Sequence, residues 1–363
     1  MLKESAVRQS LISNFLRVCE ATAIEASLWA GRADKVAANS AAMKKVRQGL
    51  GDMSMSGHVV IGQRPLTSPA APSNDNAAVA STGDVVLAPA ADKKDPDILV
   101  AGETLGRGGD SLDIVVDPIE GTNLVANNQR NAISAIVFAP RATLLNAPVK
   151  RMAKIACGPA VPPETVDIDQ TPEENIAAVA RALHKPIKDV MVCILDRPRH
   201  ANLIEHVRSL GARVKLVYDG DVQAALACAI PNTGADLMLG EGGGPEGVLA
   251  CAGLKALGGF FQARFHFTEA REREAVAAAC DFDVDQAISM DEMVRTNDIH
   301  FVATGITDGS MLKGVRHNPD GSIQTHSILV SSIDNTTSYI TKVYRAGTIG
   351  SAISEPGLHD SIF

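Results

Sequence analysis

A short run that starts at Asp117, with the sequence Asp-Pro-Ile-Glu-Gly-Thr, contains the residue types that metal-assisted phosphate chemistry requires. The mostly apolar residues 112–116 predict a strand, so Asp117 should lie at its end and Glu120 one turn later. Two carboxylates placed in this way can share divalent cations, which prefer oxygen ligands. Gly121 allows a phosphate to approach the backbone, and the Thr122 hydroxyl can orient or deprotonate an attacking water. The run predicts a metal-dependent phosphatase site; the alternative is a strand that ends in a plain polar turn.

The composition limits the classes of partner. The chain has 363 residues, a length typical of two domains. Its 34 basic and 42 acidic residues give a net charge of -8, which argues against nucleic acid because phosphate backbones favour a basic face. Aromatic residues make up only 4% of the chain, so a base-stacking surface is not expected. An acidic protein can still bind a phosphorylated metabolite where metal ions or arginines offset the charge.

The cysteines and the apolar runs indicate a compartment. The six cysteines include no Cys-x-x-Cys pair and most lie in apolar runs, which predicts buried, reduced thiols. No apolar stretch reaches the ~18 residues needed to span a bilayer. The N-terminal residues lack the apolar core of a secretory signal. We therefore expect a cytoplasmic protein with neither a membrane nor a nucleic-acid partner.

The first half of the chain contains both periodic and irregular segments. Hydrophobic periodicity predicts one or two helices at 5–30, a further helix at 40–48, a strand at 58–61, and a hairpin formed by 133–138 and 143–145. Residues 63–96 contain five prolines and many small or polar residues, which is typical of a flexible or divergent insertion.

The second half predicts alternating helices and strands. Residues 171–174, Thr-Pro-Glu-Glu, form a capping box that starts a helix. Strands are expected at 190–195, 213–217 and 235–239, helices at 201–209, 222–229 and 245–257, and an antiparallel pair at 323–332 and 339–344. This alternation is typical of a layered α/β domain. Ligands of such domains gather at the carboxyl ends of strands, where the polar clusters 196–200, 219–221 and 240–246 lie.

These features together resemble a known family. The run from Asp117 is similar to the metal-binding signature of the lithium-sensitive phosphatase superfamily, and the chain over 12–62 and 98–345 resembles class II fructose-1,6-bisphosphatases, including the bifunctional fructose-1,6-/sedoheptulose-1,7-bisphosphatases. Blocks that carry the resemblance, in chain order, are 29–35 (WAGRADK), 117–126 (DPIEGTNLVA), 145–148 (LNAP), 196–200 (DRPRH), 218–221 (YDGD), 242–247 (GGGPEG), 258–262 (GGFFQ) and 303–309 (ATGITDG).

The resemblance implies a fold and an activity. It implies an α/β fold, a layered α-β-α-β-α sandwich of the sugar phosphatase type with two subdomains. The first subdomain, 1–170, would bind the metal and contains 63–96 as an insertion. The second, 171–345, would bind the sugar phosphate, and a tail follows at 346–363. It further implies a homodimer or homotetramer that uses Mn²⁺ or Mg²⁺ to hydrolyse the 1-phosphate of fructose 1,6-bisphosphate, and also of sedoheptulose 1,7-bisphosphate, in gluconeogenesis, glycerol metabolism or the Calvin cycle.

The resemblance also implies roles for individual residues. The metal ligands would be Asp34, Asp117, Glu120 and Glu246, with Asp117 and Thr122 as catalytic residues. The substrate would be bound by Glu120, Gly121, Thr122, Arg151, Arg197, Arg199, Asp219, Asp221 and Gly243. Arginine suits such a site because its planar fork can bind phosphate oxygens in pairs. The two aspartates would accept hydrogen bonds from sugar hydroxyls, and the glycine would present its N–H at a helix start.

The sequence departs from the family pattern in two places. Gln63, followed by Arg64, stands where the family has a metal-ligating Glu. Asp92 or Asp95 is a candidate to replace the Asp that the family has close to the attacking water, and so to offset the lost ligand. Arg151 stands where the family has a phosphate-contacting Tyr, and it can still bind phosphate. Two alternatives follow. One is a catalytically impaired relative that retains sugar-phosphate binding, and the other is a phosphomonoesterase of the same superfamily that acts on an inositol or nucleotide phosphate.

Overall fold

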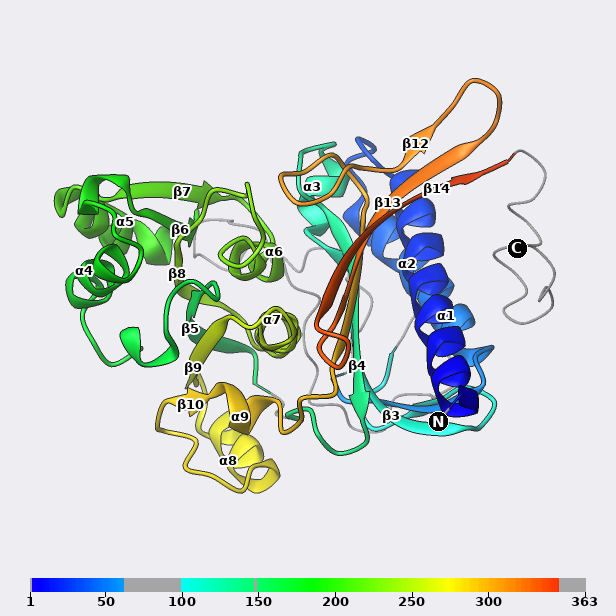
Figure 1. Cartoon of the computed structure of the whole chain (residues 1–363), viewed down its shortest axis with the longest axis horizontal. Coiled ribbons are helices and arrows are strands. Elements are labelled where there is room, and N and C mark those ends of the chain that lie inside the picture. The colour runs from blue at the N-terminus through cyan, green and yellow to red at the C-terminus, as the bar shows by residue number, and fades with distance from the viewer. Residues whose placement is uncertain (1, 62–98, 147–148, 346–363) are drawn as a thin grey trace.

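The fold consists of five layers, helix, sheet, helix, sheet and helix (Figure 1). The computed structural model describes residues 2–61, 99–146 and 149–345, with side chains from residue 10. Helices α1 and α2 cover one face of the first sheet, and α7 packs between that sheet and the second one. Helices α4 and α5 cover the far face of the second sheet. This arrangement confirms the layered α/β sandwich expected from the sequence.

The first sheet combines strands from both ends of the chain. Its order is β12-β13-β11-β4-β3-β1-β2, and β14 pairs with β13. The strands are β1 (Met55–Val59), β2 (Thr104–Leu105), β3 (Asp110–Glu120), β4 (Ile133–Pro140), β11 (His300–Gly305), β12 (Arg316–His317), β13 (Ile323–Ser331) and β14 (Thr336–Tyr344). The β1–β3 pair is parallel, whereas the pairs on either side of it are antiparallel. The β13–β14 pair confirms the C-terminal hairpin predicted from the sequence.

Two long helices pack on the outer face of this sheet. They are α1 (Leu2–Ser27), a single helix where one or two were expected, and α2 (Lys35–Gly51). Helix α2 begins before the predicted residue 40 because the Asp34 carboxylate caps it, accepting the Ala37 N–H at 2.9 Å. The helices and the sheet share an apolar core in which the Phe15 and Phe138 rings stack 3.9 Å apart.

The second sheet has the order β10-β9-β5-β8-β6-β7. Its strands are β5 (Arg151–Cys157), β6 (Met191–Leu195), β7 (Arg213–Val217), β8 (Leu237–Gly243), β9 (Phe260–His266) and β10 (Ile288–Ser289). Strands β6, β7 and β8 are parallel, and β5 runs antiparallel to β8 and β9. The parallel strands are the three that the alternating pattern predicted.

The helices around the second sheet follow the predicted pattern closely. They are α4 (Pro172–Ala182), α5 (Ala201–Ser209), α6 (Asp221–Leu226), α7 (Gly244–Ala256), α8 (Ala270–Ala279) and α9 (Met290–Met293). The capping box is present, with the Thr171 hydroxyl accepting the Glu174 N–H and the Glu174 carboxylate accepting the Thr171 N–H. Helix α7 consists largely of Gly, Ala, Val and Leu, and it is buried on nearly all sides between the two sheets.

One predicted hairpin is wrong. Strand β4 pairs with β3 and β11, and Leu144 instead forms an isolated bridge with Val294. The reason is the buried carboxylate of Asp113, which accepts the N–H groups of Thr143 at 2.8 Å and Leu144 at 3.1 Å. Arg141 contributes an ion pair to the same carboxylate at 3.0 Å. The backbone after β4 is therefore turned away from β4.

Sheet membership crosses residue 170, where the sequence predicts a boundary between subdomains. Strand β5 precedes that residue and belongs to the second sheet, whereas β11 to β14 follow it and return to the first. The order of elements along the chain does not specify which sheet each strand joins.

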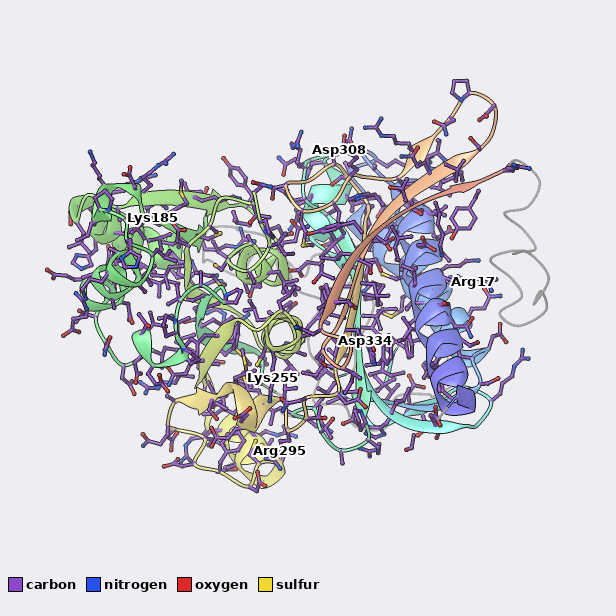
Figure 2. The ribbon with its side chains drawn as sticks, in the orientation of Figure 1. Arg17, Lys185, Lys255, Arg295, Asp308 and Asp334 are labelled. Carbon is purple, nitrogen blue, oxygen red and sulfur yellow. The ribbon has the colours of Figure 1, made fainter. Side chains whose placement is uncertain are left out.

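Charged side chains such as Lys185 and Arg295 lie at the outside of the second half of the molecule (Figure 2), paired with Asp236 and Asp281. Within the described ranges, no helix is long and apolar enough to cross a membrane.

Candidate active site

Two carboxylates of the predicted motif lie on one side of β3 because the strand is irregular there. Asp117 pairs with Ala135 and Glu120 with Ile133, so three steps along β3 oppose two along β4. In a regular strand, residues three apart point to opposite faces, and the extra residue reverses this. Pro118 lacks an N–H and cannot continue the ladder. The strand was expected to end at residue 116; it continues through Glu120 instead.

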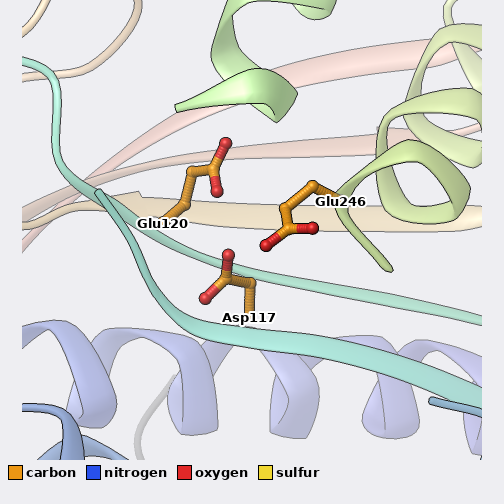
Figure 3. Close-up of side chains that lie close together, drawn as sticks. All are labelled: Asp117, Glu120 and Glu246. Carbon is orange, nitrogen blue, oxygen red and sulfur yellow. The ribbon is translucent and has the colours of Figure 1, made fainter. Parts of the chain in front are cut away.

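Glu246 reaches the same place from the second half of the chain. It lies in the first turn of α7, directly after β8. Ligand oxygens of Asp117, Glu120 and Glu246 all lie within 4.8 Å of one another, and all three side chains are buried (Figure 3). Segments more than a hundred residues apart thus bring together three of the four carboxylates that the family resemblance implied as metal ligands.

The burial of these acids together has a large electrostatic effect. Burial, with the nearby charges of Asp117, Glu246 and Asp221, raises the pKa of Glu120 well above its usual value. Burial, with Asp117 and Asp221, raises the pKa of Glu246 to about 8. Three ionised carboxylates this close repel one another, so the cluster requires either protons or cations. It thus has the charge and the oxygen ligands that a hard divalent cation needs.

Two buried polar atoms, one in the cluster itself and one two residues after Glu120, test whether a metal and its ligands fit here. Glu246 Oε2 and Thr122 Oγ1 are buried, and neither has a hydrogen-bond partner in the described part of the chain. Such atoms are costly unless something binds them. Thr122 starts the short helix α3 (Thr122–Ala126), after Gly121 at φ +90°. A Cβ at Gly121 would lie 2.7 Å from the Leu124 side chain, so this turn requires glycine.

Asp221 is bound by a lysine that sequence analysis did not single out. Lys154 Nζ donates to Asp221 Oδ2 at 2.5 Å, and the Gly243 N–H donates to the same oxygen at 2.9 Å. Lys154 is buried within β5, and its positive charge lowers the pKa of nearby Glu246, against the larger raising effects. The sequence signal for this pair was the lysine in the otherwise mostly apolar strand 151–157. Because lysine is rarely buried without a partner, a lysine in such a strand indicates a buried acid nearby.

The other predicted sugar-binding aspartate pairs with an arginine. Arg197 Nη2 lies 3.1 Å from Asp219 Oδ1, and Arg197 also donates to the Tyr218 carbonyl. Asn123 of α3 donates to Asp219 Oδ2 at 3.2 Å, which joins the two halves of the site. Burial raises the pKa of Asp219 to about 6, although the Arg197 charge and the Asn123 hydrogen bond oppose this shift.

The two remaining predicted arginines share one acid. Arg151 Nη1 lies 3.0 Å and Arg199 Nε 3.9 Å from Glu241 Oε1, and Arg199 also donates to the Glu241 carbonyl. Glu241 belongs to the polar cluster 240–246, but the sequence assigned it no role. The arginines therefore lie at the ends of β5 and β6, next to the strand that leads to Glu246.

Comparison with known proteins agrees with this geometry. The sequence matches the family described as "Bacterial fructose-1,6-bisphosphatase, glpX-encoded" over residues 9–72 and 75–344. It is 33% identical over 350 residues to the D-fructose 1,6-bisphosphatase class 2/sedoheptulose 1,7-bisphosphatase of Prochlorococcus marinus (strain MIT 9303), covering 93% of this chain and 96% of that protein. The chain belongs to this family of bacterial fructose-1,6-bisphosphatases. It is also 33% identical over 351 residues to the fructose-1,6-bisphosphatase class 2 of Haemophilus influenzae, covering 93% of this chain and 97% of that one.

Membership of the fructose-1,6-bisphosphatase family implies that the protein depends on a divalent metal. The clustered carboxylates fit that requirement. Asp34, the fourth predicted ligand, is exposed and caps α2, and it is not part of the group within 4.8 Å. Its loop is nevertheless joined to α3, since the Gly31 and Ala33 N–H groups donate to the carbonyls of residues 125 and 126. A metal role for Asp34 stays a prediction.

The positions where the sequence departs from the fructose-1,6-bisphosphatase pattern are only partly described. Gln63, Arg64, Asp92 and Asp95 lie outside the described residues, as do the insertion 63–96 and the tail 346–363. Arg151 is described, and it is half-exposed at the start of β5. The predicted substrate contact of Gly243 is through its N–H, which in this structure donates to Asp221.

Proposed function

We propose that the protein hydrolyses the 1-phosphate of fructose 1,6-bisphosphate, and also that of sedoheptulose 1,7-bisphosphate, with Mg²⁺ or Mn²⁺ as its cation. The observation that supports this most strongly is the buried cluster of Asp117, Glu120 and Glu246, followed along the chain by the Thr122 hydroxyl, which has no hydrogen-bond partner among the described residues. The relatives found by comparison are named for these two substrates or for the first of them.

Each part of the site has a task in this reaction. Asp117, Glu120 and Glu246 would hold the cation, which supplies a Lewis acid and lowers the pKa of a bound water. The Thr122 hydroxyl would hydrogen-bond the attacking water and hold it in line with the scissile bond. The negative charge that develops would then lie in a buried region, where electrostatic stabilisation is strong. The carboxylates therefore provide charge, and Thr122 provides orientation.

The distal phosphate of the sugar would bind at the arginines. Arg151 starts β5 and Arg199 follows β6, the two strands that flank β8, which leads to Glu246. Their guanidinium groups have the geometry and charge to bind phosphate oxygens. A substrate with two phosphates at opposite ends would thus contact both the acidic cluster and the arginines. This favours a sugar bisphosphate over an inositol or nucleotide monophosphate.

Other features of the protein remain predictions. The homodimer or homotetramer and the cytoplasmic location were expected from the sequence and from the resemblance to the family. Analytical ultracentrifugation would test the oligomeric state. Measuring the activity with Mg²⁺ and with Mn²⁺ would decide which cation the protein uses.

Phosphate release by the purified protein tests the proposal. With Mn²⁺ or Mg²⁺ present, we expect turnover of fructose 1,6-bisphosphate and sedoheptulose 1,7-bisphosphate, and much slower turnover of inositol 1-phosphate and of a nucleotide monophosphate. A chelator should abolish the activity. No phosphate release from either bisphosphate would refute the proposal and favour the impaired relative, and faster release from a monophosphate would favour the other phosphomonoesterase.

A further inference from the structure

Glu241 is the centre of a charged cluster near the carboxyl end of β8, in the middle of the second sheet. Its carboxylate lies 3.0 Å from Arg151 Nη1, 3.9 Å from Arg199 Nε and 3.0 Å from His266 Nδ1. The side chains of the three partners are between 28% and 48% exposed, and that of Glu241 is 18% exposed. The cluster can therefore be reached from solvent, while its acid lies beneath its basic groups.

The register of the sheet explains how the cluster is assembled. Arg151 on β5 lies directly opposite His266 on β9, and Ala153 lies opposite Glu241 on β8. Residues two apart in a strand share a face, so Arg151, Glu241 and His266 project to the same side. Arg199 follows β6, the other neighbour of β8. Three strands and the short 3-10 helix Pro198–His200 thus direct their charges to one point.

The backbone holds Glu241 in place independently of its side chain. Its N–H donates to His200 Nε2 at 2.8 Å, and its carbonyl accepts two hydrogen bonds from Arg199, at 3.2 and 2.5 Å. His200 Nδ1 lies 2.7 Å from the Leu195 carbonyl, so the proton is on Nδ1 and the imidazole is neutral. A change confined to the Glu241 carboxylate should therefore leave the strand and Arg199 where they are.

The acid offsets repulsion between two cations. Burial and the Arg151 charge both lower the pKa of the Arg199 guanidinium, and the Glu241 charge opposes them. The remaining arginine, Arg197, is paired with Asp219 instead. In the free protein Glu241 thus serves as the anion for Arg151 and Arg199. A phosphate monoester, with a charge of about -1.5 to -2 at neutral pH, is an anion of greater charge for the same two groups.

We propose that Glu241 is an internal counterion which the distal phosphate of a sugar bisphosphate displaces from Arg151 and Arg199 when the substrate binds. This inference rests on the proposed function and adds a specificity-determining residue to it. The displaced carboxylate repels the phosphate, so it selects against weakly charged ligands and favours release of the monophosphate product. Glu241 returns to the arginines when the product leaves.

Removing only the charge of Glu241 tests this directly. In Glu241→Gln, with Mn²⁺ bound, we expect fructose 6-phosphate to bind roughly three- to tenfold more tightly, because the competing ion pairs are gone. The KM for fructose 1,6-bisphosphate should fall by a similar factor, while that for fructose 1-phosphate, which lacks the distal phosphate, should not change. The matched control is Glu269→Gln, which neutralises the exposed partner of Lys150, the neighbour of Arg151. It should change none of these values.

A second variant gives an independent result. Arg151→Gln should weaken fructose 6-phosphate binding, and adding Glu241→Gln to it should yield a smaller gain than in the wild type. Unchanged or weaker binding in Glu241→Gln, or no binding of fructose 6-phosphate by any variant, would overturn the inference. These binding measurements by calorimetry do not depend on turnover. A failure of the proposed function would instead appear as absence of phosphate release by the wild type.

Discussion

Lys154 Nζ lies 2.5 Å from Asp221 Oδ2, and the lysine side chain is completely buried. This ion pair lies close to the acidic cluster, since the charge of Asp221 raises the pKa of Glu246 and the charge of Lys154 lowers it. Asp221 also accepts the Gly243 N–H, two residues after Glu241 and three before Glu246. Lys154 is thus a positioning residue that fixes Asp221, and through Gly243 it fixes the start of α7, which carries Glu246.

Replacing Lys154 by Met should destabilise the protein strongly. The change leaves the Asp221 carboxylate buried without its partner, a loss of about 3–5 kcal/mol for a broken buried pair. Thermal unfolding would measure the fall in Tm. The double variant Lys154→Met with Asp221→Asn should recover much of that loss, since it removes both charges. Equal Tm values for the single and double variants would show that the pair is not coupled.

The stability of the metal-free protein should depend on pH through Glu246, whose pKa is about 8. Its unfolded value is about 4.3, so the folded state retains a proton that the unfolded state releases. The contribution of this proton to the free energy of unfolding is fully present below the pKa of Glu246 in the unfolded chain. It is lost as the pH rises through the folded value of about 8. Cations bind the ionised form, so Mn²⁺ should raise the Tm more at about pH 8 than at about pH 5.5.

Thermal unfolding with chelator and with Mn²⁺, at both pH values, provides the measurement. Glu246→Gln is the control, because it carries no proton to release. A gain in Tm from Mn²⁺ that does not vary with pH, or that is the same in the control, would contradict the assignment of the cation to this cluster.

The Thr122 hydroxyl should matter for rate and not for stability. It has no hydrogen-bond partner in the described part of the chain, so Thr122→Val removes no bond seen in the structure. We expect kcat to fall about a hundredfold or more with little change in Tm, as for loss of a group that acts on a proton or water. Thr122→Ser keeps the hydroxyl and should retain most of the activity. Equal kcat values for the two variants would exclude the role given to the hydroxyl.

A side chain at Gly243 should weaken metal binding, because this residue lies very close to the Glu246 carboxylate. A Cβ at this position would lie 1.9 Å from Glu246 Oε2, so Gly243→Ala must displace that carboxylate. We expect Mn²⁺ binding, measured by calorimetry, to weaken roughly 10- to 100-fold, as for loss of a group that orients a ligand. Gly51→Ala is the control, since nothing lies within 4 Å of its Cβ. The control should bind Mn²⁺ as the wild type does. Wild-type binding by Gly243→Ala would contradict the assignment of the cation to the cluster that contains Glu246.

The elements of the second sheet were predictable because their signals are local. The capping box of α4 and the bounds of α5 and β7 depend on residues within one or two turns. The spacing after the predicted strand indicated that Asp117 and Glu120 share a cation, whereas the expected addition of Glu246 came from the family resemblance. The irregularity in β3 that turns the two motif carboxylates to one side was not predicted, because a bulge depends on its partner strand.

Contacts between distant segments explain what the sequence did not reveal. The hairpin predicted after β4 fails because Asp113, about thirty residues away, binds the backbone there. Lys154 has its partner 67 residues along the chain, and Arg151 meets Glu241 only across the β5–β8 pair. Asp34 has the sequence context of a metal ligand and the local structure of a helix cap. Periodicity and spacing carry no information about such pairings.

The most direct test of the account is phosphate release from fructose 1,6-bisphosphate by the wild type and by Asp117→Asn, each with Mn²⁺. Asp117 contributes an oxygen to the cluster that would hold the cation. We predict metal-dependent turnover by the wild type and a loss of about a thousandfold or more in the variant, since electrostatic stabilisation is the largest contribution to such catalysis. Turnover that persists in the variant, or that needs no metal in the wild type, would contradict the account.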